Sequence, residues 1–264
     1  MRRDQIIDSI KSVAEDFDTI ARHTILNKNL NKHVHEVNSI INLSPNTTDI
    51  KILDVGGGMG VNLLTLAKLN YGKEYSLVDR FDEYLSGTSM GTYDEAAIER
   101  FSKYNISFYN QDVVSKPVLN FESDYFDIVT IIDVIEHLPA NPIQLLTEIN
   151  RVLKSGGTIY MASPNLFGLN EIVNFLSGKH AYIKFNEWIK PRYYSHFREY
   201  TYAEHKKLLE LAGFHNIVAS FNQHSFWLRF KREHGLNALK YLAGFFVTSI
   251  LPFTKSSITV TGNK

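Results

Sequence analysis

The chain has 264 residues, which is enough for one large domain with a sizeable core and favours that arrangement over two equal domains. Its 28 lysine and arginine residues balance its 28 acidic residues, so no overall positive field draws it to nucleic acid or to an anionic membrane. It contains no cysteine, which excludes disulfide bonds, thiolate metal sites and a thiol nucleophile.

The N-terminus and the longest apolar tract bear on where the protein works. No apolar region follows Arg2 and Arg3, so we predict no signal peptide and expect a cytoplasmic protein. The apolar tract at 241–253 is shorter than the roughly 20 residues that span a membrane. It is typical of a segment that covers a pocket, and peripheral contact with a membrane is a less favoured alternative.

Residues 1–48 are predicted to form an N-terminal helical cap ahead of the first strand. Apolar residues recur there at helical spacing, for example at Ile6, Ile10 and Val13. His33 and His35 stand close together in this segment. We interpret them as exposed polar positions on a helix rather than as metal ligands.

A strand, a glycine cluster and a helix follow each other from residue 50 onward. The apolar run at 50–55 is typical of a buried parallel strand, and beyond Gly60 apolar residues return at helical spacing. Glycines let the backbone approach a ligand closely, and the first amides of a helix have no partner within it. The sequence therefore predicts a ligand-binding loop here, with the pattern Asp54-x-Gly56-x-Gly58-x-Gly60. A dinucleotide site of the G-x-G-x-x-G type is disfavoured, because counting from Gly56 its third glycine would fall on Val61.

Acidic residues follow the next predicted strands. Asp79 ends the strand at 74–79, about twenty residues past the glycines, where an acid in a mononucleotide-binding unit meets ribose hydroxyls. Asp112 and Val113 follow a strand at 106–110. Further strands are predicted at 125–132, 158–163, 216–221 and 257–261, and helices at 61–67, 92–104, 143–153 and 201–212.

The motifs between residues 50 and 165 resemble, in unbroken order, those of class I S-adenosylmethionine-dependent methyltransferases. They include the glycine pattern, Glu136-His137-Leu138 after a buried strand, and Arg151-Val-Leu-Lys-x-Gly-Gly before the next one. The string His196-x-Arg198-Glu199-Tyr200-Thr201 resembles methyltransferases that act on ubiquinone precursors and on bacterial surface polysaccharides.

This resemblance implies an α/β fold, a Rossmann-like doubly wound sheet of seven strands that is mostly parallel with an antiparallel last strand. We expect a single methyltransferase domain over 1–264, with the cap at 1–48, a cofactor-binding core at 49–165 and two aromatic-rich insertions on the substrate side at 166–200 and 222–255.

The resemblance also implies S-adenosyl-L-methionine as cofactor and S-adenosyl-L-homocysteine as product. In the family, the carboxylate at Asp54 reaches toward the amino acid part of the cofactor. The acid at Asp112 and the amide of Val113 meet the adenine, and Asp133 is a further candidate contact to the cofactor.

His137 and His196 are the candidate catalytic bases. Methyl transfer from a sulfonium requires in-line positioning of the acceptor, and an alcohol must also lose its proton during attack. A neutral imidazole near pH 7 is suited to accept that proton. The alternatives, a histidine bonded to backbone at a helix start and a packing residue in an aromatic loop, remain open.

Two further roles stay as hypotheses at this stage. Arg198 could hold an anionic part of the substrate as a bidentate donor, and Tyr200 stands beside it. The ubiquinone-precursor enzymes carry an E-x-x-E-H metal cluster, which corresponds here to Asp133, Glu136 and His137. Because aspartate replaces the first glutamate and no fourth ligand is obvious, a divalent metal is not favoured.

We therefore expect a small-molecule O-methyltransferase, with a sugar or activated intermediate of surface polysaccharide biosynthesis as first acceptor. The alternatives are a prenylated phenol or other lipid-like acceptor, and an already ionised oxygen such as a phosphate. A non-catalytic cofactor-binding regulator is less favoured, because the acids and His137 are intact. No nucleic acid partner is expected, and the oligomeric state is left open.

Overall fold

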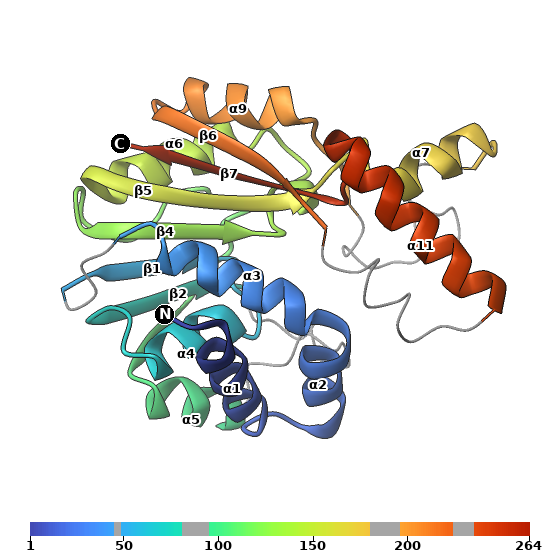
Figure 1. Ribbon diagram of the computed structural model, residues 1–264. Helices are drawn as coiled ribbons and strands as arrows, with labels where there is room; N and C mark the ends of the chain where they lie inside the picture. Colours follow the sequence, from blue (N-terminus) through green and yellow to red (C-terminus); the bar gives the residue numbers. More distant parts are fainter. Residues whose placement is uncertain (45–48, 81–94, 180–195, 224–234) are drawn as a thin grey trace.

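A computed structural model describes residues 1–44, 49–80, 95–179, 196–223 and 235–264 (Figure 1). Its strands form one seven-stranded sheet in the order β3-β2-β1-β4-β5-β7-β6. The strands are β1 (Lys51–Val55), β2 (Glu74–Asp79), β3 (Ile106–Asn110), β4 (Phe126–Ile132), β5 (Leu153–Pro164), β6 (His215–Asn222) and β7 (Ser257–Asn263).

Strands β1 to β5 run parallel, whereas β7 pairs antiparallel with both β5 and β6. The predicted seven-stranded, mostly parallel α/β fold with an antiparallel last strand is thereby confirmed. Because β1 reverses the strand order between β2 and β4, its carboxyl end is the topological switch point where such sheets bind ligands.

Helices cover both faces of the sheet. The described helices are α1 (Arg3–Ala14), α2 (Thr19–His23), α3 (Leu30–Ile41), α4 (Val61–Lys68), α5 (Glu95–Lys103), α6 (Ile143–Val152), α7 (Leu169–Leu176), α9 (Tyr202–Leu211) and α11 (Gly235–Ile250). A π turn, η1 (Thr24–Asn29), joins α2 to α3, and short 3-10 turns lie at η3 (Ile135–His137) and η4 (Pro252–Thr254).

Two clusters of buried apolar residues lie between the sheet and the helices, one on each face. One joins α1, α3, α4 and α5 to one face of the sheet, and the other joins α6 and α9 to the opposite face. Neighbouring residues of β1 divide between them, since Ile52 belongs to the first cluster and Leu53 to the second, and both are fully buried. This two-sided burial explains why the strand is apolar without alternation.

The boundary between α6 and β5 differs from the sequence prediction. Helix α6 ends at Val152, and β5 already begins at Leu153, with Gly156 at a φ of +77° within it. Helix α5 starts at Glu95, and the predicted residues 92–94 lie outside the described residues. The predicted start of α9 is confirmed by a reciprocal capping box, in which Thr201 and Glu204 each accept the other's backbone amide.

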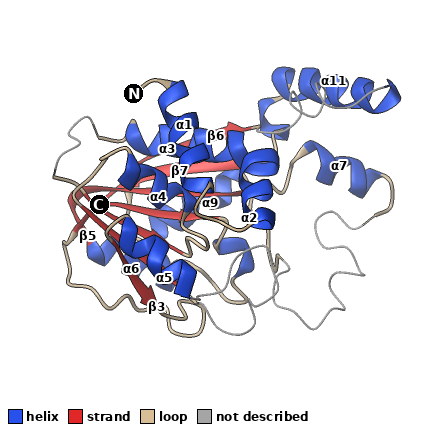
Figure 2. Ribbon diagram, turned by 90° about the horizontal axis from the view of Figure 1, so that it is seen from below, coloured by secondary structure: helices blue, strands red, loops and turns tan. Residues whose placement is uncertain are grey.

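The insertions contribute α7 and α11, which project from the sheet next to each other (Figures 1 and 2). Both helices expose large apolar side chains: Phe175 is 72% exposed, Leu176 78% and Ile250 75%. Several predicted aromatic residues, at 180–195 and 224–234, lie outside the described residues. Among the helices that are described, none combines the length and apolarity needed to cross a membrane.

Candidate active site

The glycine loop joins β1 to α4 through three residues in the left-handed conformation. Gly56, Gly58 and Gly60 have φ values of 71°, 54° and 70°. A side chain on Gly56 would also collide, because its Cβ would lie 2.4 Å from a methyl group of Val134. The loop therefore packs against the residues that follow β4. Its positive φ values and this close contact both require glycine.

Asp54 lies beneath this loop. Its carboxylate is 4% exposed and accepts a hydrogen bond of 2.6 Å from the hydroxyl of Thr130, its register partner on β4. A Cβ on Gly57 would lie 2.4 Å from its other oxygen. Burial raises the pKa of Asp54 to about 6, and the carboxylate of Asp79 adds to this. The Asp54 side chain thus supports the loop from inside.

Asp79 holds the loop from the end of β2. One carboxylate oxygen accepts the amide of Gly58 and the other the amide of Arg80, each at 2.6 Å. Burial raises the pKa of Asp79 to about 6. A carboxylate fixed beside the loop in this way is suited to accept ribose hydroxyls, the role predicted for it.

Asp112 lies one strand further along the same edge, and Arg80 links it to Asp79. The Arg80 guanidinium contacts the Asp112 carboxylate at 3.1 Å, while the amides of Val114 and Ser115 donate to its other oxygen. Burial would raise the pKa of Asp112, but these hydrogen bonds outweigh it and hold the pKa below its ordinary value. Val113 is 7% exposed and packs into the cluster under α6.

Asp133 follows β4 on the other side of the loop, with a φ of +54°. Its amide donates to the carbonyl of Ala162 at 2.9 Å, and its carboxylate is bound by the ammonium group of Lys32 from α3. Lys32 also lies 3.9 Å from Glu36. Burial would lower the pKa of Lys32, but the carboxylates of Asp133 and Glu36 outweigh it and raise the pKa.

The two predicted catalytic histidines meet beyond Asp133. The amide of Phe197 donates to the carbonyl of Glu136 at 2.7 Å, which ties the segment at 196–200 to the η3 turn. The rings of His137 and His196 are therefore 4.9 Å apart, edge to face. Nδ1 of His196 bonds to the carboxylate of Glu199 at 2.7 Å, and this bond raises the pKa of His196.

Glu136 is buried beside these histidines. It is fully inaccessible, and neither carboxylate oxygen has a hydrogen-bond partner among the described residues. Burial, with the nearby Asp133 carboxylate, raises the pKa of Glu136 to about 8.

The structure assembles a different group of potential metal ligands from the one considered from the sequence. Ligand atoms of Glu136, His137 and His196 lie within 4.8 Å of one another, whereas Asp133 is occupied by Lys32. These three residues could hold a divalent cation, and two imidazoles with one carboxylate suit Zn²⁺ better than Mg²⁺. A cation held there would act as a Lewis acid on an acceptor oxygen.

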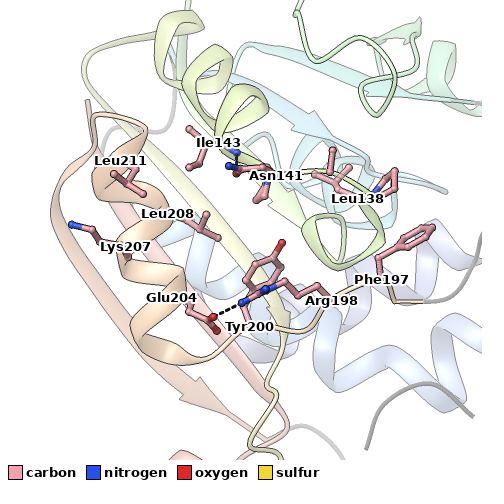
Figure 3. A pocket seen from close by; sticks show the side chains of 13 residues that line it. Leu138, Asn141, Ile143, Phe197, Arg198, Tyr200, Glu204, Lys207, Leu208 and Leu211 are labelled. Atoms are coloured by element: carbon pink, nitrogen blue, oxygen red, sulfur yellow. Dashed lines mark hydrogen bonds and ion pairs between the residues drawn. The ribbon is translucent and has the colours of Figure 1, made fainter. Parts of the chain in front are cut away.

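The predicted substrate residues Arg198 and Tyr200 line a separate cavity of about 580 Å³ between α6 and α9 (Figure 3). Its floor is apolar, with Leu138, Ile143 and Leu208, and Arg198 at its rim is paired with Glu204. His137 and His196 do not line this cavity, although the next residue of each, Leu138 and Phe197, does. The two histidines thus lie together, whereas Arg198 and Tyr200 line a different cavity.

Along the carboxyl edge the polar groups follow the strand order: Asp112 after β3, Asp79 on β2, the glycine loop after β1, and Asp133 after β4. This order and the left-handed glycine loop define the site of a class I S-adenosylmethionine-dependent methyltransferase. The chain belongs to the methyltransferase domain family, whose model matches residues 28–219. S-adenosyl-L-methionine is accordingly its cofactor.

The chain is similar to curated ubiquinone biosynthesis O-methyltransferases. It is 24% identical to the mitochondrial protein of Dictyostelium discoideum over 151 residues, which are 54% of this chain and 46% of that protein. It is 26% identical to the Coxiella burnetii protein over 174 residues, 62% of this chain and 66% of that protein. The match thus spans about half to two thirds of these relatives.

Solved methyltransferases share the fold. One from Archaeoglobus fulgidus has a TM-score of 0.56 at 17% identity, and the match covers 92% of this chain and 100% of that chain. Phosphoethanolamine N-methyltransferase 2 of Haemonchus contortus, solved with S-adenosylhomocysteine, has a TM-score of 0.59 at 16% identity, with 92% of this chain and 56% of that chain covered.

Three residues of the site were not recognised from the sequence. Lys32 and Glu36 stand one helical turn apart, beside the apolar stripe of α3. This spacing of a lysine and a glutamate next to buried positions is the sequence feature that could have indicated them. Glu199 stands three residues after His196. The interpretation of His33 as an exposed position is wrong: its Nδ1 bonds to Asn62 at 2.8 Å, and burial lowers its pKa to about 4.

Proposed function

We propose that the protein transfers the methyl group of S-adenosylmethionine to a hydroxyl oxygen of a small amphiphilic acceptor, a prenylated phenol or a similar lipid-tailed molecule. The observation that carries this proposal is the bond of 2.7 Å between His196 and Glu199, beside His137 at the carboxyl end of β4. It supplies a positioned base where an acceptor hydroxyl would meet the methyl group.

A hydroxyl needs such a base, because its proton must leave as the oxygen attacks the methyl carbon. Against the Glu199 carboxylate, Nδ1 of His196 is the donor, so in the neutral ring Nε2 is left as the proton acceptor. Bound S-adenosylmethionine would supply the methyl group as an electrophile with a neutral thioether as leaving group, and Nε2 of His196 would take the proton that the hydroxyl loses as its oxygen bonds to the methyl carbon.

Two observations favour a lipid-tailed acceptor. The curated relatives are O-methyltransferases of ubiquinone biosynthesis. In addition, α7 and α11 lie beyond the carboxyl end of β5 (Figure 1), and these helices expose Phe175, Leu176 and Ile250. The comparisons give no support to a sugar acceptor, which therefore serves as the competing arm of the test.

The test is transfer of a labelled methyl group from S-adenosylmethionine to three acceptors: a prenylated catechol, a nucleotide-activated sugar and a phosphate monoester. We expect label in the ether of the prenylated catechol, and loss of most of the turnover in His196→Ala. Label in the sugar or in the phosphate would replace the proposed acceptor. Full turnover by His196→Ala would show that the acceptor oxygen attacks already ionised.

A further inference from the structure

The cavity between α6 and α9 lies apart from the groups that define the methyl-transfer site (Figure 3). Its volume of about 580 Å³ falls within the range of roughly 300–1,000 Å³ that is typical of small-molecule pockets. Neither the acids of the carboxyl edge nor the two histidines belong to its lining. The cavity is therefore large enough to hold a ligand of its own.

Most of the cavity wall is apolar. Phe197 and Leu211 line it and are still 45% and 56% exposed, so a ligand that covers them removes apolar surface from water. The other apolar side chains come from the segment before α6, from its first residue and from α9: Leu138, Pro139, Ala140, Pro142, Ile143 and Leu208. A ligand that fits this wall has an apolar body.

Tyr200 places a polar group in this apolar space. The residue is only 5% exposed, and its hydroxyl points into the cavity (Figure 3). Its ring contacts His205 and Arg198, but no described residue forms a hydrogen bond with the hydroxyl. Burial raises the pKa of Tyr200, so the hydroxyl keeps its proton and is a donor at neutral pH. Buried tyrosine hydroxyls normally have a hydrogen-bond partner, and here a ligand would supply it.

The charged residues of the lining favour a ligand with one negative charge. They are Arg198, Lys207 and Glu204, which leaves one positive charge in excess. Glu204 already accepts the amide of Thr201 at 2.8 Å and is paired with Arg198. The Arg198 side chain is 60% exposed and lies over the Tyr200 ring, 5.3 Å from its centroid. A guanidinium has five N–H donors, so Arg198 can bind Glu204 and an anion at the same time.

We propose that this cavity is a second ligand site, which binds a small carboxylate with an apolar body. The body fills the space between α6 and α9, Arg198 binds the carboxylate, and Tyr200 donates to it. The first residues of both helices, Ile143 and Tyr202, lie at the cavity, so the partial positive charge of each helix start also favours an anion.

The cavity is bounded by the two stretches of chain that carry the candidate bases. Leu138 follows His137 in the sequence, Phe197 follows His196, and both Leu138 and Phe197 line the cavity. The amide of Phe197 also donates to the carbonyl of Glu136 at 2.7 Å. A bound carboxylate thus contacts both stretches and holds them together. It acts on the methyl-transfer site without being methylated.

The test uses octanoate, octan-1-ol and acetate as probes. Octanoate has both a carboxylate and an apolar chain, octan-1-ol keeps the chain without the charge, and acetate keeps the carboxylate without the chain. Calorimetry on the wild-type protein should show saturable binding of octanoate. The Kd of each of the other two probes should be at least about tenfold higher.

Two variants locate the bound octanoate. Arg198→Met should raise its Kd roughly 10- to 100-fold, the effect of losing a hydrogen bond between charged groups, and should leave the Kd of octan-1-ol within about twofold. Tyr200→Phe removes only the hydroxyl and should raise the Kd of octanoate about 2- to 10-fold. Tyr109→Phe is the matched control, because Tyr109 is a 40% exposed tyrosine of β3, at the other edge of the sheet, and it should change neither Kd.

Thermal unfolding of the ligand-free variants shows whether they are folded, and if Arg198→Met is not, Tyr200→Phe carries the test. The proposal is overturned if octanoate binds the folded variants as tightly as the wild type, because it then lies elsewhere, for example on the exposed apolar side chains of α7. It is equally overturned if S-adenosylhomocysteine displaces octanoate.

The remaining measurement separates this site from methyl transfer. Octanoate incubated with the protein and labelled S-adenosylmethionine should stay unlabelled. Label in its methyl ester would show that the carboxylate reaches the methyl group, so that the cavity belongs to the methyl-transfer site and is not a second site. None of these measurements uses the acceptor proposed above, so their outcome is independent of it.

Discussion

The carboxylate of Asp79 accepts the backbone amide of Gly58 at 2.6 Å, so the end of β2 is tied to the middle of the glycine loop. The same carboxylate accepts the amide of Arg80, whose guanidinium contacts Asp112 at 3.1 Å. The loop and the ends of β2 and β3 are therefore held together before any ligand binds. Such preorganisation lowers the cost of ordering the site when the cofactor arrives.

The first prediction concerns Asp79 itself. Asp79→Asn removes the negative charge and turns one acceptor oxygen into a donor, which opposes the backbone amide that it faces, Gly58 or Arg80, and leaves one oxygen fewer to accept from a ribose hydroxyl. We expect a roughly 10- to 100-fold higher Kd for S-adenosylhomocysteine, and the same factor for 5′-methylthioadenosine, because both carry the ribose. Calorimetry with the two ligands measures this. A loss confined to S-adenosylhomocysteine would contradict the assignment of Asp79 to the ribose.

The second prediction is a pH dependence of cofactor binding. Burial raises the pKa of Asp79 to about 6, so lowering the pH through 6 protonates it and removes an acceptor for the ribose. The affinity for 5′-methylthioadenosine should therefore fall between pH 7.5 and 5.5. In Asp79→Asn this part of the pH dependence should be absent, and an unchanged pH profile in that variant would count against the assignment.

Stability should respond to the same titration in the opposite direction. A carboxyl group whose folded-state pKa lies above its ordinary value binds protons more tightly when folded. Asp54 and Asp79 both belong to this kind. Their contribution to the free energy of unfolding is fully present below pH 4 and is lost as the pH rises through about 6. As the pH rises from 5.5 to 7.5, the affinity for the ligand should therefore increase while the free energy of unfolding decreases.

A third prediction uses two glycines of the loop as a matched pair. Gly56 and Gly58 both have positive φ, so alanine is strained at either position. A Cβ on Gly56 would lie 2.4 Å from Val134, whereas one on Gly58 meets no atom of the described residues within 4 Å. Gly56→Ala should therefore lower the free energy of unfolding by about 1–3 kcal/mol more than Gly58→Ala does. Urea unfolding of both variants measures the difference, and equal losses would contradict the packing of Val134 on the loop.

The sequence was sufficient for the parts of this molecule that depend on short stretches of chain. The apolar run of β1, the glycines after it and the acid that ends β2 each carry a local pattern, and the topology rules place them at one edge. The capping box at Thr201 and Glu204 is local in the same way. These features were predicted because neighbours in the sequence determine them.

Contacts between distant segments were not predictable in this way. The Lys32–Asp133 pair joins residues that are 101 positions apart, and the approach of His196 to His137 depends on a backbone bond between Phe197 and Glu136. The boundary of α6 was missed because Val152 passes directly into β5, so the glycines at 156 and 157 do not end the helix. Tertiary pairing decided each of these features.

The fourth prediction is that removing metal ions leaves turnover unchanged. Nδ1 of His196 is already bound to the Glu199 carboxylate and the Asp133 carboxylate to Lys32, so His196 is positioned as a base without a cation. Dialysis against EDTA followed by the labelled-methyl assay measures the effect. Loss of turnover that is restored by Zn²⁺ or Mn²⁺ would transfer the activating role from His196 to a cation held by Glu136, His137 and His196.

The last prediction separates positioning from binding at the proposed base. Glu199→Gln keeps an oxygen that can accept the Nδ1 hydrogen of His196 but removes the charge that stabilises the imidazolium formed when Nε2 takes the proton. We expect kcat to fall, by a smaller factor than the roughly 10²- to 10⁴-fold loss expected of His196→Ala. The KM for the acceptor should stay the same. Glu210→Gln is the control, because Glu210 is an exposed acid of α9 whose partner, Lys207, lies 3.1 Å away on the surface. A higher KM with unchanged kcat in Glu199→Gln would assign Glu199 to acceptor binding, since a charge that acts only on the imidazolium has no effect before the proton moves.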